Sequence, residues 1–273
     1  MNKLGFIGFG SMGSMLVSGL INTGYVSQEQ IIVTRKNKSR LDEIKDIWKD
    51  VITTDDIIEV LKEAKYIFIC VKPLEYMNIL ENIKSCILPS QHIISIAGSV
   101  TLEYLDGIIN CKITKVMPTI TSEVNAGISL ICHNSKVTPE DAEIIESMFK
   151  IISKVKQISE KDFGLASEFT SCGPGLISAI FEEFVEAGLK HTNSLSKEDT
   201  QEMVLHTLLG TAKLMLERNM SFEEVISRVA TKGGITEEGV KVLESGLPPV
   251  FSEMFNKTMN KRKLVSEKVS HTL

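Results

Sequence analysis

Three glycines near the N-terminus have the spacing of a loop that binds a dinucleotide. They lie in Gly8-Phe9-Gly10-Ser11-Met12-Gly13, which follows the apolar run 4–7 and precedes a helical pattern. The first glycine of such a segment permits a tight turn, the second lets the backbone approach a pyrophosphate, and the third lets the helix pack close to the strand. The N-terminus of the helix then faces the anion. We expect all six residues to contact the cofactor; the alternative is a glycine-rich turn without a ligand.

The end of the second apolar run indicates that this dinucleotide is NADP. A carboxylate here would accept hydrogen bonds from the ribose hydroxyls of NAD, whereas an arginine pairs with the 2′-phosphate of NADP. The chain reads Ile31-Ile32-Val33-Thr34-Arg35-Lys36 and has no carboxylate from Ile31 until Asp42. We expect Thr34 and Arg35 to hold the phosphate, because a guanidinium can bind its oxygens bidentately. NAD is the alternative cofactor, and a solvated Arg35-Lys36 pair is the alternative interpretation.

Two further apolar runs end in short segments that we expect to flank the nicotinamide. The first ends in Val71-Lys72-Pro73 and the second in Ala97-Gly98. Ligands of open parallel sheets bind outside the carboxyl ends of the strands, where both segments would lie. For Lys72, a solvated lysine ahead of a helix is an equally good interpretation.

The pattern of apolar residues predicts a sheet followed by helices. Strand-like runs at 4–7, 31–34, 51–53, 66–71, 92–97, 113–117, 127–132 and 155–158 alternate with helical patterns. The run 66–71 is apolar on both faces, as in a parallel sheet covered on both sides. Beyond it, helix start signals stand at Thr138, Ser196 and Ser221. We expect an α/β Rossmann domain with a mostly parallel, doubly wound sheet over residues 1–160 and an all-α dimerisation domain over residues 161–273.

Composition excludes several classes of protein. The 273 residues include 30 Lys and Arg against 35 Asp and Glu, so no basic excess exists to neutralise nucleic acid phosphates. Residues 4–28 carry no charge, but glycines and serines interrupt them, which argues against a signal peptide or membrane span. The five cysteines form no C-x-x-C pair and the five histidines have no metal spacing. We expect a cytoplasmic protein with reduced thiols and no metal, and with neither nucleic acid nor membrane as a partner.

The chain resembles the pyrroline-5-carboxylate reductases over nearly its whole length. The motifs that carry the resemblance are Gly8 to Gly13, Val71-Lys72-Pro73, Ser95-Ile96-Ala97-Gly98, Met117-Pro118, Cys172-Gly173-Pro174, Gly233-Gly234-Ile235-Thr236 and Leu243-Glu244-Ser245-Gly246. The resemblance implies reduction of the C=N bond of 1-pyrroline-5-carboxylate to proline with NADPH or NADH. It also implies a homodimer formed through the C-terminal helices, and larger rings of dimers. The apolar face of 175–189 is wide enough for a core or, as we favour, a subunit interface.

Departures from the family motifs fall where the resemblance places the substrate. The family's Met-Pro-Asn-Thr-Pro is here 117–121 without the Asn, and Cys172 replaces a Ser beside the expected substrate. The segment 233–236 opens a helix and would offer its N–H groups to the substrate's carboxylate, with Thr236 as the residue that orients substrate for catalysis. Glu237 and Glu238 follow in the first turn, where they favour the helix dipole and would repel an arriving carboxylate if they pointed inward.

The same departures leave more than one function open. They resemble the ComER-type late-competence proteins, which share Pro-x-Ile-Thr, Ser-Cys-Gly-Pro and Lys-Gly-Gly-x-Thr. We expect a reductase of pyrroline-5-carboxylate or a related cyclic imine; the alternative is a cofactor-binding, catalytically weak or inactive homologue with a regulatory role. A third class, the β-hydroxyacid dehydrogenases, uses a Lys-x-x-Asn pair. The segment 190–193 fits that string, but it lies at a predicted helix end beside Gly188, so we disfavour this class.

Overall fold

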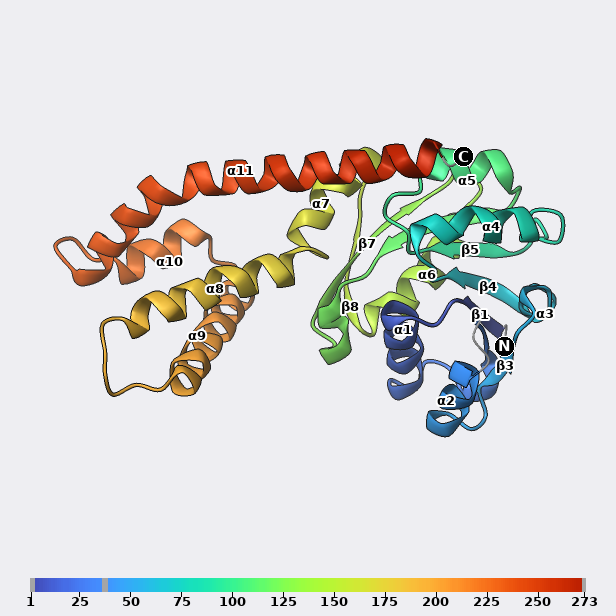
Figure 1. The fold of residues 1–273 in the computed structure, drawn as a ribbon, viewed down its shortest axis with the longest axis horizontal. Helices are drawn as coiled ribbons and strands as arrows, with labels where there is room; N and C mark the ends of the chain where they lie inside the picture. The colour runs from blue at the N-terminus through green and yellow to red at the C-terminus, as the bar shows by residue number, and fades with distance from the viewer. Residues whose placement is uncertain (1–2, 36–38, 272–273) are drawn as a thin grey trace. The chain divides into compact units, whose positions relative to one another are not determined.

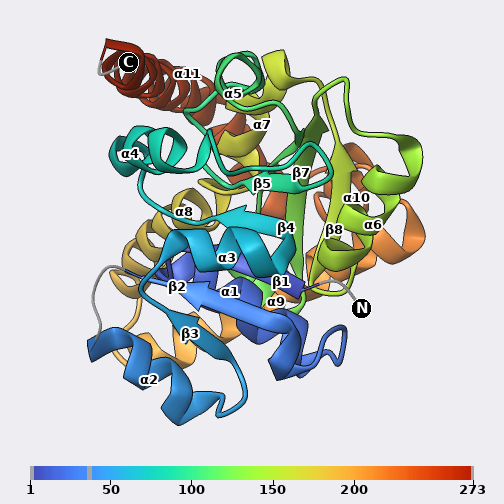
Figure 2. The same cartoon turned by 90° about the vertical axis from the view of Figure 1, so that its right-hand side faces the viewer.

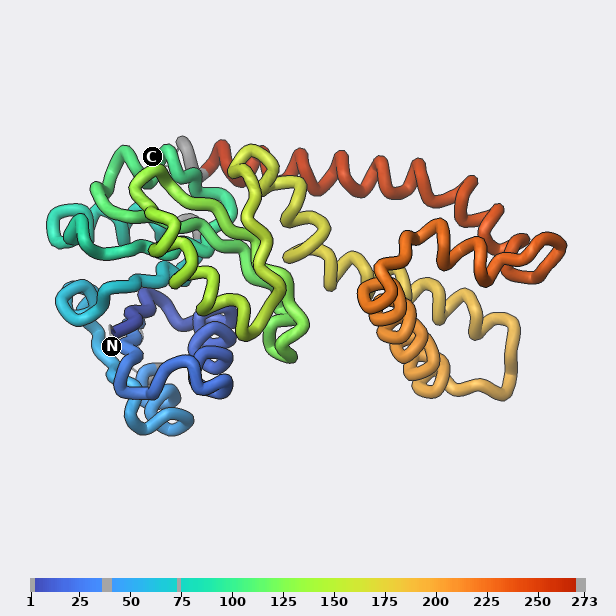
Figure 3. Tube along the Cα trace, turned by 180° about the vertical axis from the view of Figure 1, so that it is seen from behind, coloured from blue at the N-terminus to red at the C-terminus, as the bar shows by residue number. Residues whose placement is uncertain are grey.

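The computed structural model describes residues 3–35 and 39–271, and it gives no side-chain description for 39–40, 73–74 and 269–271 (Figures 1, 2 and 3). The chain forms two compact units. The first comprises Met1–Gly173 with Met259–Leu273, and the second comprises Pro174–Thr258. These units divide the chain after residue 173; the domain boundary expected after residue 160 stays a prediction.

One eight-stranded sheet forms the centre of the first unit. Its strands are β1 (Lys3–Ile7), β2 (Ile31–Thr34), β3 (Ile52–Thr54), β4 (Ala64–Ile69), β5 (His92–Ser95), β6 (Lys112–Met117), β7 (Gly127–His133) and β8 (Ser153–Gln157). Their order is β3-β2-β1-β4-β5-β6-β7-β8. All neighbours pair in parallel except β6 and β7. The strand order changes direction between β1 and β4, so ligand binding is expected at the carboxyl ends of these strands. The expected mostly parallel Rossmann sheet is confirmed.

Helices cover both faces of this sheet. They are α1 (Ser11–Asn22), α2 (Ser39–Ile47), α3 (Ile57–Glu63), α4 (Pro73–Ile83), α5 (Leu102–Ile108), α6 (Pro139–Lys150) and α7 (Phe163–Phe169), with short 3₁₀ turns η1 (Gln28–Gln30), η2 (Ile120–Val124) and η3 (Glu160–Asp162). Alternate strand residues face opposite sides. Phe6 packs with side chains of α1, α2 and α6, whereas Ile7 packs with those of α3, α4 and α5. Each face therefore has its own apolar core.

Element ends follow local signals in the sequence. The Thr138 side chain accepts a hydrogen bond from the Asp141 N–H and begins α6, and Ser196 and Ser221 cap the next helices in the same way. All three predicted helix starts are confirmed. Strand β4 ends at Ile69, two residues before the predicted end, because the chain leaves the sheet once the Cys70 N–H has bonded to the Ile7 carbonyl.

The second unit is helical and has almost no buried side chains of its own. It contains α8 (Gly173–Leu189), α9 (Lys197–Arg218), α10 (Phe222–Val229) and most of α11 (Ile235–His271). Among its residues, which are all described, Val185 is the only buried hydrophobic side chain. A helical unit without a core is expected to gain one from another protein surface. Among the described helices, none has the length and apolar content needed to cross a bilayer.

The buried His92, at the start of β5, lies near the half-buried His133, at the end of β7. His92 Nε2 lies 2.7 Å from Thr114 Oγ1, which is 2.8 Å from His133 Nδ1. Burial lowers the pKa of His92 from 6.5 to about 4, against a smaller opposing effect of the Asp141 carboxylate, and it also lowers the pKa of His133. His92 is therefore neutral in the folded protein at pH values where the unfolded chain binds a proton.

We predict that acid destabilises the protein through His92. Between pH 6.5 and about 4, only the unfolded state protonates this ring, so the free energy of unfolding falls as the pH falls, by roughly 1 kcal/mol per pH unit. Urea unfolding at a series of pH values checks this. His92→Gln flattens the slope in that window, whereas His206→Gln, at a ring that is 75% exposed, leaves it unchanged. Equal slopes in the wild type and His92→Gln would contradict the prediction.

Candidate active site

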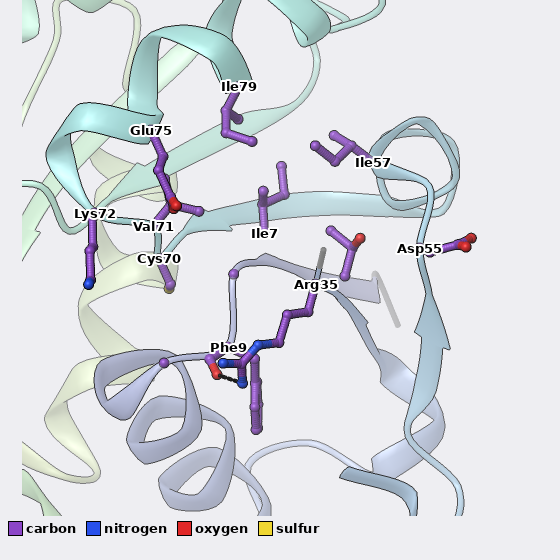
Figure 4. Close-up of a pocket in the computed structure, with 13 residues that line it drawn as sticks. Ile7, Phe9, Arg35, Asp55, Ile57, Cys70, Val71, Lys72, Glu75 and Ile79 are labelled. Atoms are coloured by element: carbon purple, nitrogen blue, oxygen red, sulfur yellow. Dashed lines mark hydrogen bonds between the residues drawn. The ribbon is translucent and has the colours of Figure 1, made fainter. Parts of the chain in front are cut away.

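A cavity of about 350 Å³ opens at the carboxyl ends of β1, β2 and β4 in the first unit (Figure 4). Its lining brings together residues from three segments that the sequence singled out: Gly8, Phe9, Gly10, Thr34, Arg35, Val71 and Lys72. Ser11, Met12 and Gly13 do not line it. Ser11 borders a separate cavity, and Met12 packs against the apolar core.

The glycine turn lets α1 begin close to the strands. Gly8 has a φ of +92°, and a Cβ there would lie 2.8 Å from the Cys70 carbonyl oxygen. A Cβ at Gly13 would lie 2.8 Å from the carbonyl oxygen of Gly8, so helix and turn pack without room for a side chain. A Cβ at Gly10 would meet no atom within 4 Å, because this position faces open space.

The start of α1 is free to bind an anion. Gly10 occupies the N-cap position, no side chain caps the helix, and its first turn contains no acidic residue. The first N–H groups of a helix have no partner within it and lie at the positive end of its dipole. Phe9 holds the turn in place, since its ring packs edge-on against Trp48 at a centroid distance of 6.1 Å. This arrangement suits a pyrophosphate.

Arg35 reaches across the cavity toward the glycine turn (Figure 4). Its Nη1 donates a hydrogen bond of 2.7 Å to the Phe9 carbonyl oxygen. Thr34 is only 2% exposed, and its carbonyl oxygen accepts from the Gly8 N–H. Arg35 is therefore positioned at the end of β2 to bind a phosphate group. Lys36 lies outside the described residues.

The expected nicotinamide residues divide into two groups. Val71 and Lys72 line the cavity, and the backbone of Pro73 begins α4, although its side chain is not described. Ala97 and Gly98 follow β5 and do not line this cavity. A side chain at Gly98 would collide with Met117, so the two strand ends pack closely.

An ion pair joins β6 to η3 beside the start of α5. Lys115 on β6 is 3% exposed, and its Nζ lies 3.0 Å from Glu160 Oε1. The same oxygen accepts a hydrogen bond of 2.8 Å from the Leu102 N–H at the start of α5. Lys115 and Glu160 were not singled out from the sequence, because they are 45 residues apart. Their pairing depends on the fold, which brings β6 and η3 next to each other.

Other cavity residues were also not predicted. They are Ile7, Asp55, Ile57, Cys70, Glu75 and Ile79. Asp55 directly follows β3, so its position at the end of a third parallel strand could have indicated it. Ile57 and Ile79 come from α3 and α4, and their position in the cavity depends on how these helices pack. Burial raises the pKa of the Cys70 thiol to about 12, so this thiol is not a nucleophile at neutral pH.

Cys172 lies in the first unit beside a buried ion pair. Its Sγ is 3.9 Å from Arg262 Nη2, and that guanidinium binds Glu168 Oε1 at 2.5 and 3.1 Å. Glu168 is only 2% exposed. Burial and the Glu168 carboxylate raise the pKa of the Cys172 thiol, which keeps it protonated and argues against nucleophilic catalysis.

The turn of Gly233, Gly234, Ile235 and Thr236 lies in the second unit. Gly233 has a φ of +74°, and the Gly234 N–H bonds to the Thr231 carbonyl at 2.8 Å. Ile235 begins α11 and is 95% exposed, and Thr236 is exposed beside it. The two glutamates that follow behave differently: Glu237 Oε2 accepts a 2.7 Å hydrogen bond from the Gly233 N–H, whereas Glu238 pairs with Lys241.

Two alternatives have little support in the described residues. The segment 190–193 follows the end of α8, where the N–H groups of Lys190, His191 and Thr192 bond to carbonyls of the last helical turn. This is a helix end, as the sequence indicated. Within 3–35 and 39–271, no group of three or more His, Cys, Asp or Glu side chains is placed to hold a metal ion.

We predict that alanine at Gly13 lowers stability, whereas alanine at Gly10 weakens NADPH binding. Gly13→Ala forces the start of α1 away from the Gly8 carbonyl and lowers the free energy of unfolding by about 1–3 kcal/mol. Gly10→Ala meets no protein atom, so it changes stability by less than about 1 kcal/mol but weakens NADPH binding, because the new methyl group projects into open space at the helix start. Thermal unfolding and NADPH fluorescence titration measure both effects. Unchanged NADPH affinity in Gly10→Ala would contradict the proposed place of the pyrophosphate.

Comparison with known proteins identifies the family. The family described as "Pyrroline-5-carboxylate reductase dimerisation" matches residues 160–264, and "NADP oxidoreductase coenzyme F420-dependent" matches residues 3–99. The chain is 37% identical to "Pyrroline-5-carboxylate reductase 3" of Bacillus subtilis (strain 168) over 98% of both chains. It is 30% identical to "ComE operon protein 4" of the same organism over 94% of this chain and 93% of that protein.

Solved structures agree with this relationship. The pyrroline-5-carboxylate reductase of Coxiella burnetii superposes with a TM-score of 0.84 at 28% identity over 98% of both chains. The Plasmodium falciparum pyrroline carboxylate reductase, solved with NADP bound, gives a TM-score of 0.81 at 26% identity over 99% of this chain and 98% of that chain. The expected resemblance is confirmed, and the chain belongs to the pyrroline-5-carboxylate reductase family.

Proposed function

We propose that this chain reduces the C=N bond of 1-pyrroline-5-carboxylate to give proline, with NADPH as the hydride donor. The observation that carries the proposal is the 37% identity to a pyrroline-5-carboxylate reductase across 98% of both chains. The cavity at the glycine turn supports it, because it joins a free helix start to an arginine at the end of β2. Oxidoreductases of this kind obtain their hydride from the cofactor, while the protein supplies binding and orientation.

The residues around the cavity fit NADP. The start of α1 and the turn from Gly8 to Gly13 would hold the pyrophosphate, with Gly10 offering the open approach. Arg35 would hold the 2′-phosphate, with Thr34 beside it, by exchanging the Phe9 carbonyl for phosphate oxygens. Val71, Lys72, Pro73, Ala97 and Gly98 would flank the nicotinamide. The NADP bound in the Plasmodium relative supports this choice of cofactor.

Substrate binding is assigned to the turn at the start of α11. Its N–H groups at Gly233, Gly234 and Ile235 would bind the carboxylate, and the Thr236 hydroxyl would orient the ring. Cys172 would border the substrate as a neutral thiol, since burial raises its pKa. Imine reduction needs mainly alignment of the reacting atoms, which can lower a barrier by about 7–11 kcal/mol. A protonated imine, or proton delivery through water, removes the need for a strong general acid.

A second function is favoured by one specific observation. The Glu237 carboxylate binds the Gly233 N–H, in the turn assigned to the substrate's carboxylate. A cofactor-binding homologue with weak or no reductase activity and a regulatory role would tolerate this contact. The 30% identity to "ComE operon protein 4" is consistent with such a role. Turnover separates the two functions.

We infer that two copies form a homodimer through the C-terminal helices. The match of residues 160–264 to the dimerisation family supports this, as does the nearly coreless second unit. On α9, the exposed side chains Leu205, Leu209 and Leu216 lie at helical spacing on one face. Burying one such side chain contributes about 1.5–3 kcal/mol. The larger rings of dimers and the cytoplasmic location stay predictions.

Steady-state oxidation of NADPH in the presence of 1-pyrroline-5-carboxylate tests the proposed function. We expect turnover within roughly 1–10³ per second. Arg35→Ala raises the KM for NADPH by about 10- to 100-fold, because charge-assisted hydrogen bonds to the 2′-phosphate are lost. The KM for NADH, which lacks this phosphate, changes little and serves as the control. Tight NADPH binding without oxidation would favour the regulatory alternative.

We predict that Leu209→Glu weakens the dimer. A carboxylate on the apolar face of α9 cannot be buried without a partner, so the dissociation constant rises by at least about tenfold. Thr207→Glu is the matched control, because Thr207 is exposed and lies about 160° around α9 from Leu209. Sedimentation velocity over a dilution series measures both. Equal dissociation constants for the two variants would contradict an interface on the leucine face.

A further inference from the structure

We propose that Glu237 is an internal competitor for the carboxylate of the substrate and thereby sets the affinity for anionic imines. The inference rests on the proposed function of the turn from Gly233 to Thr236. It assigns to Glu237 a role in specificity that is separate from binding or catalysis. The side chain occupies an N–H group that the substrate needs.

The Glu237 carboxylate is already bound in the glycine turn. Glu237 Oε2 lies 2.7 Å from the Gly233 nitrogen, a length typical of a charge-assisted hydrogen bond. The φ of +74° at Gly233 turns this N–H toward the first turn of α11, where Glu237 stands. The Glu237 side chain is only 31% exposed, so it lies against the turn.

A substrate carboxylate and the Glu237 carboxylate would use the same donor. They carry like charges, so simultaneous binding would add repulsion to the competition for one N–H. An anionic substrate therefore has to displace the side chain, whereas a cyclic imine without a carboxylate does not. The contact lowers affinity for the first class of imine and leaves the second class unaffected.

Lys241 offers Glu237 an alternative partner. Its Nζ lies 3.8 Å from Glu237 Oε2, one helical turn along α11. It is already bound to Glu238 Oε1 at 2.7 Å. A small rotation of the Glu237 side chain would pair it with this ammonium group, so that the Gly233 N–H becomes free without leaving a carboxylate unpaired.

Glu238 provides a matched control within the same helical turn. It carries the same charge and adjoins Glu237, but its carboxylate pairs with Lys241 and does not contact the glycine turn. An effect of general negative charge near the helix start would appear equally in both positions. An effect of occupying the Gly233 N–H would be larger at Glu237, because a change at Glu238 acts on that N–H only through Lys241.

Steady-state kinetics of the full chain with two imines test the proposal. We expect Glu237→Gln to lower the KM for 1-pyrroline-5-carboxylate by roughly two- to tenfold, the range set by the net free energy of a single hydrogen bond. With 1-pyrroline, which lacks the carboxylate, kcat/KM stays at the wild-type value. Glu238→Gln lowers the KM for 1-pyrroline-5-carboxylate by a smaller factor, because it leaves the Glu237 carboxylate in place and only frees Lys241 to pair with it. An unchanged or raised KM in Glu237→Gln, or equal effects of both variants, overturns the proposal.

Calorimetric titration with L-proline keeps the test independent of turnover. On protein saturated with NADP⁺, Glu237→Gln should bind proline more tightly than both the wild type and Glu238→Gln. If proline binds to neither the wild type nor the variant, the proposal is overturned. A wild type that binds proline but oxidises no NADPH contradicts the proposed reductase, while tighter binding by Glu237→Gln would still support the competition.

Discussion

The cavity proposed to hold the cofactor depends on the close approach of α1 to the ends of β1 and β4. This approach exists because Gly8 and Gly13 carry no side chain: a Cβ at either would lie 2.8 Å from a backbone oxygen. The helix can therefore begin directly at the carboxyl edge of the sheet, with an uncapped N-terminus directed at the cavity. Arg35 arrives at the same edge because β2 pairs in parallel with β1, which places Thr34 beside Ile7. The sheet thus assembles an anion site from residues that are far apart in the chain.

The two compact units contribute different parts of the proposed chemistry. The first unit has a full apolar core on each face of its sheet and contains the cofactor residues. The second contains the turn assigned to the substrate but has a single buried hydrophobic side chain, Val185. We therefore expect its stability to depend on association with another copy. The end of α11 belongs to the first unit, where Arg262 pairs with the buried Glu168, so one helix contributes to both units.

Local patterns predicted most of the fold and part of the site. All eight strands lie within two residues of their predicted ranges, because their apolar runs are short and bounded by turn residues. The predicted caps at Thr138, Ser196 and Ser221 form as expected, since capping depends on residues three apart. Asp55 and Ile79 could not be assigned to the cavity, because their positions follow from strand order and helix packing. The contact of Glu237 with Gly233 depends on the conformation of the Glu237 side chain, which the sequence does not determine.

We propose that the cofactor held at the glycine turn delivers its hydride to the imine carbon of pyrroline-5-carboxylate. Deuterium transfer tests this most directly. The protein is incubated with NADPH that carries deuterium at the transferable C4 position, and the proline formed is analysed by mass spectrometry. We expect proline with one deuterium, at the ring carbon that was double-bonded to nitrogen. Unlabelled proline, or no proline from protein that binds NADPH tightly, would contradict it.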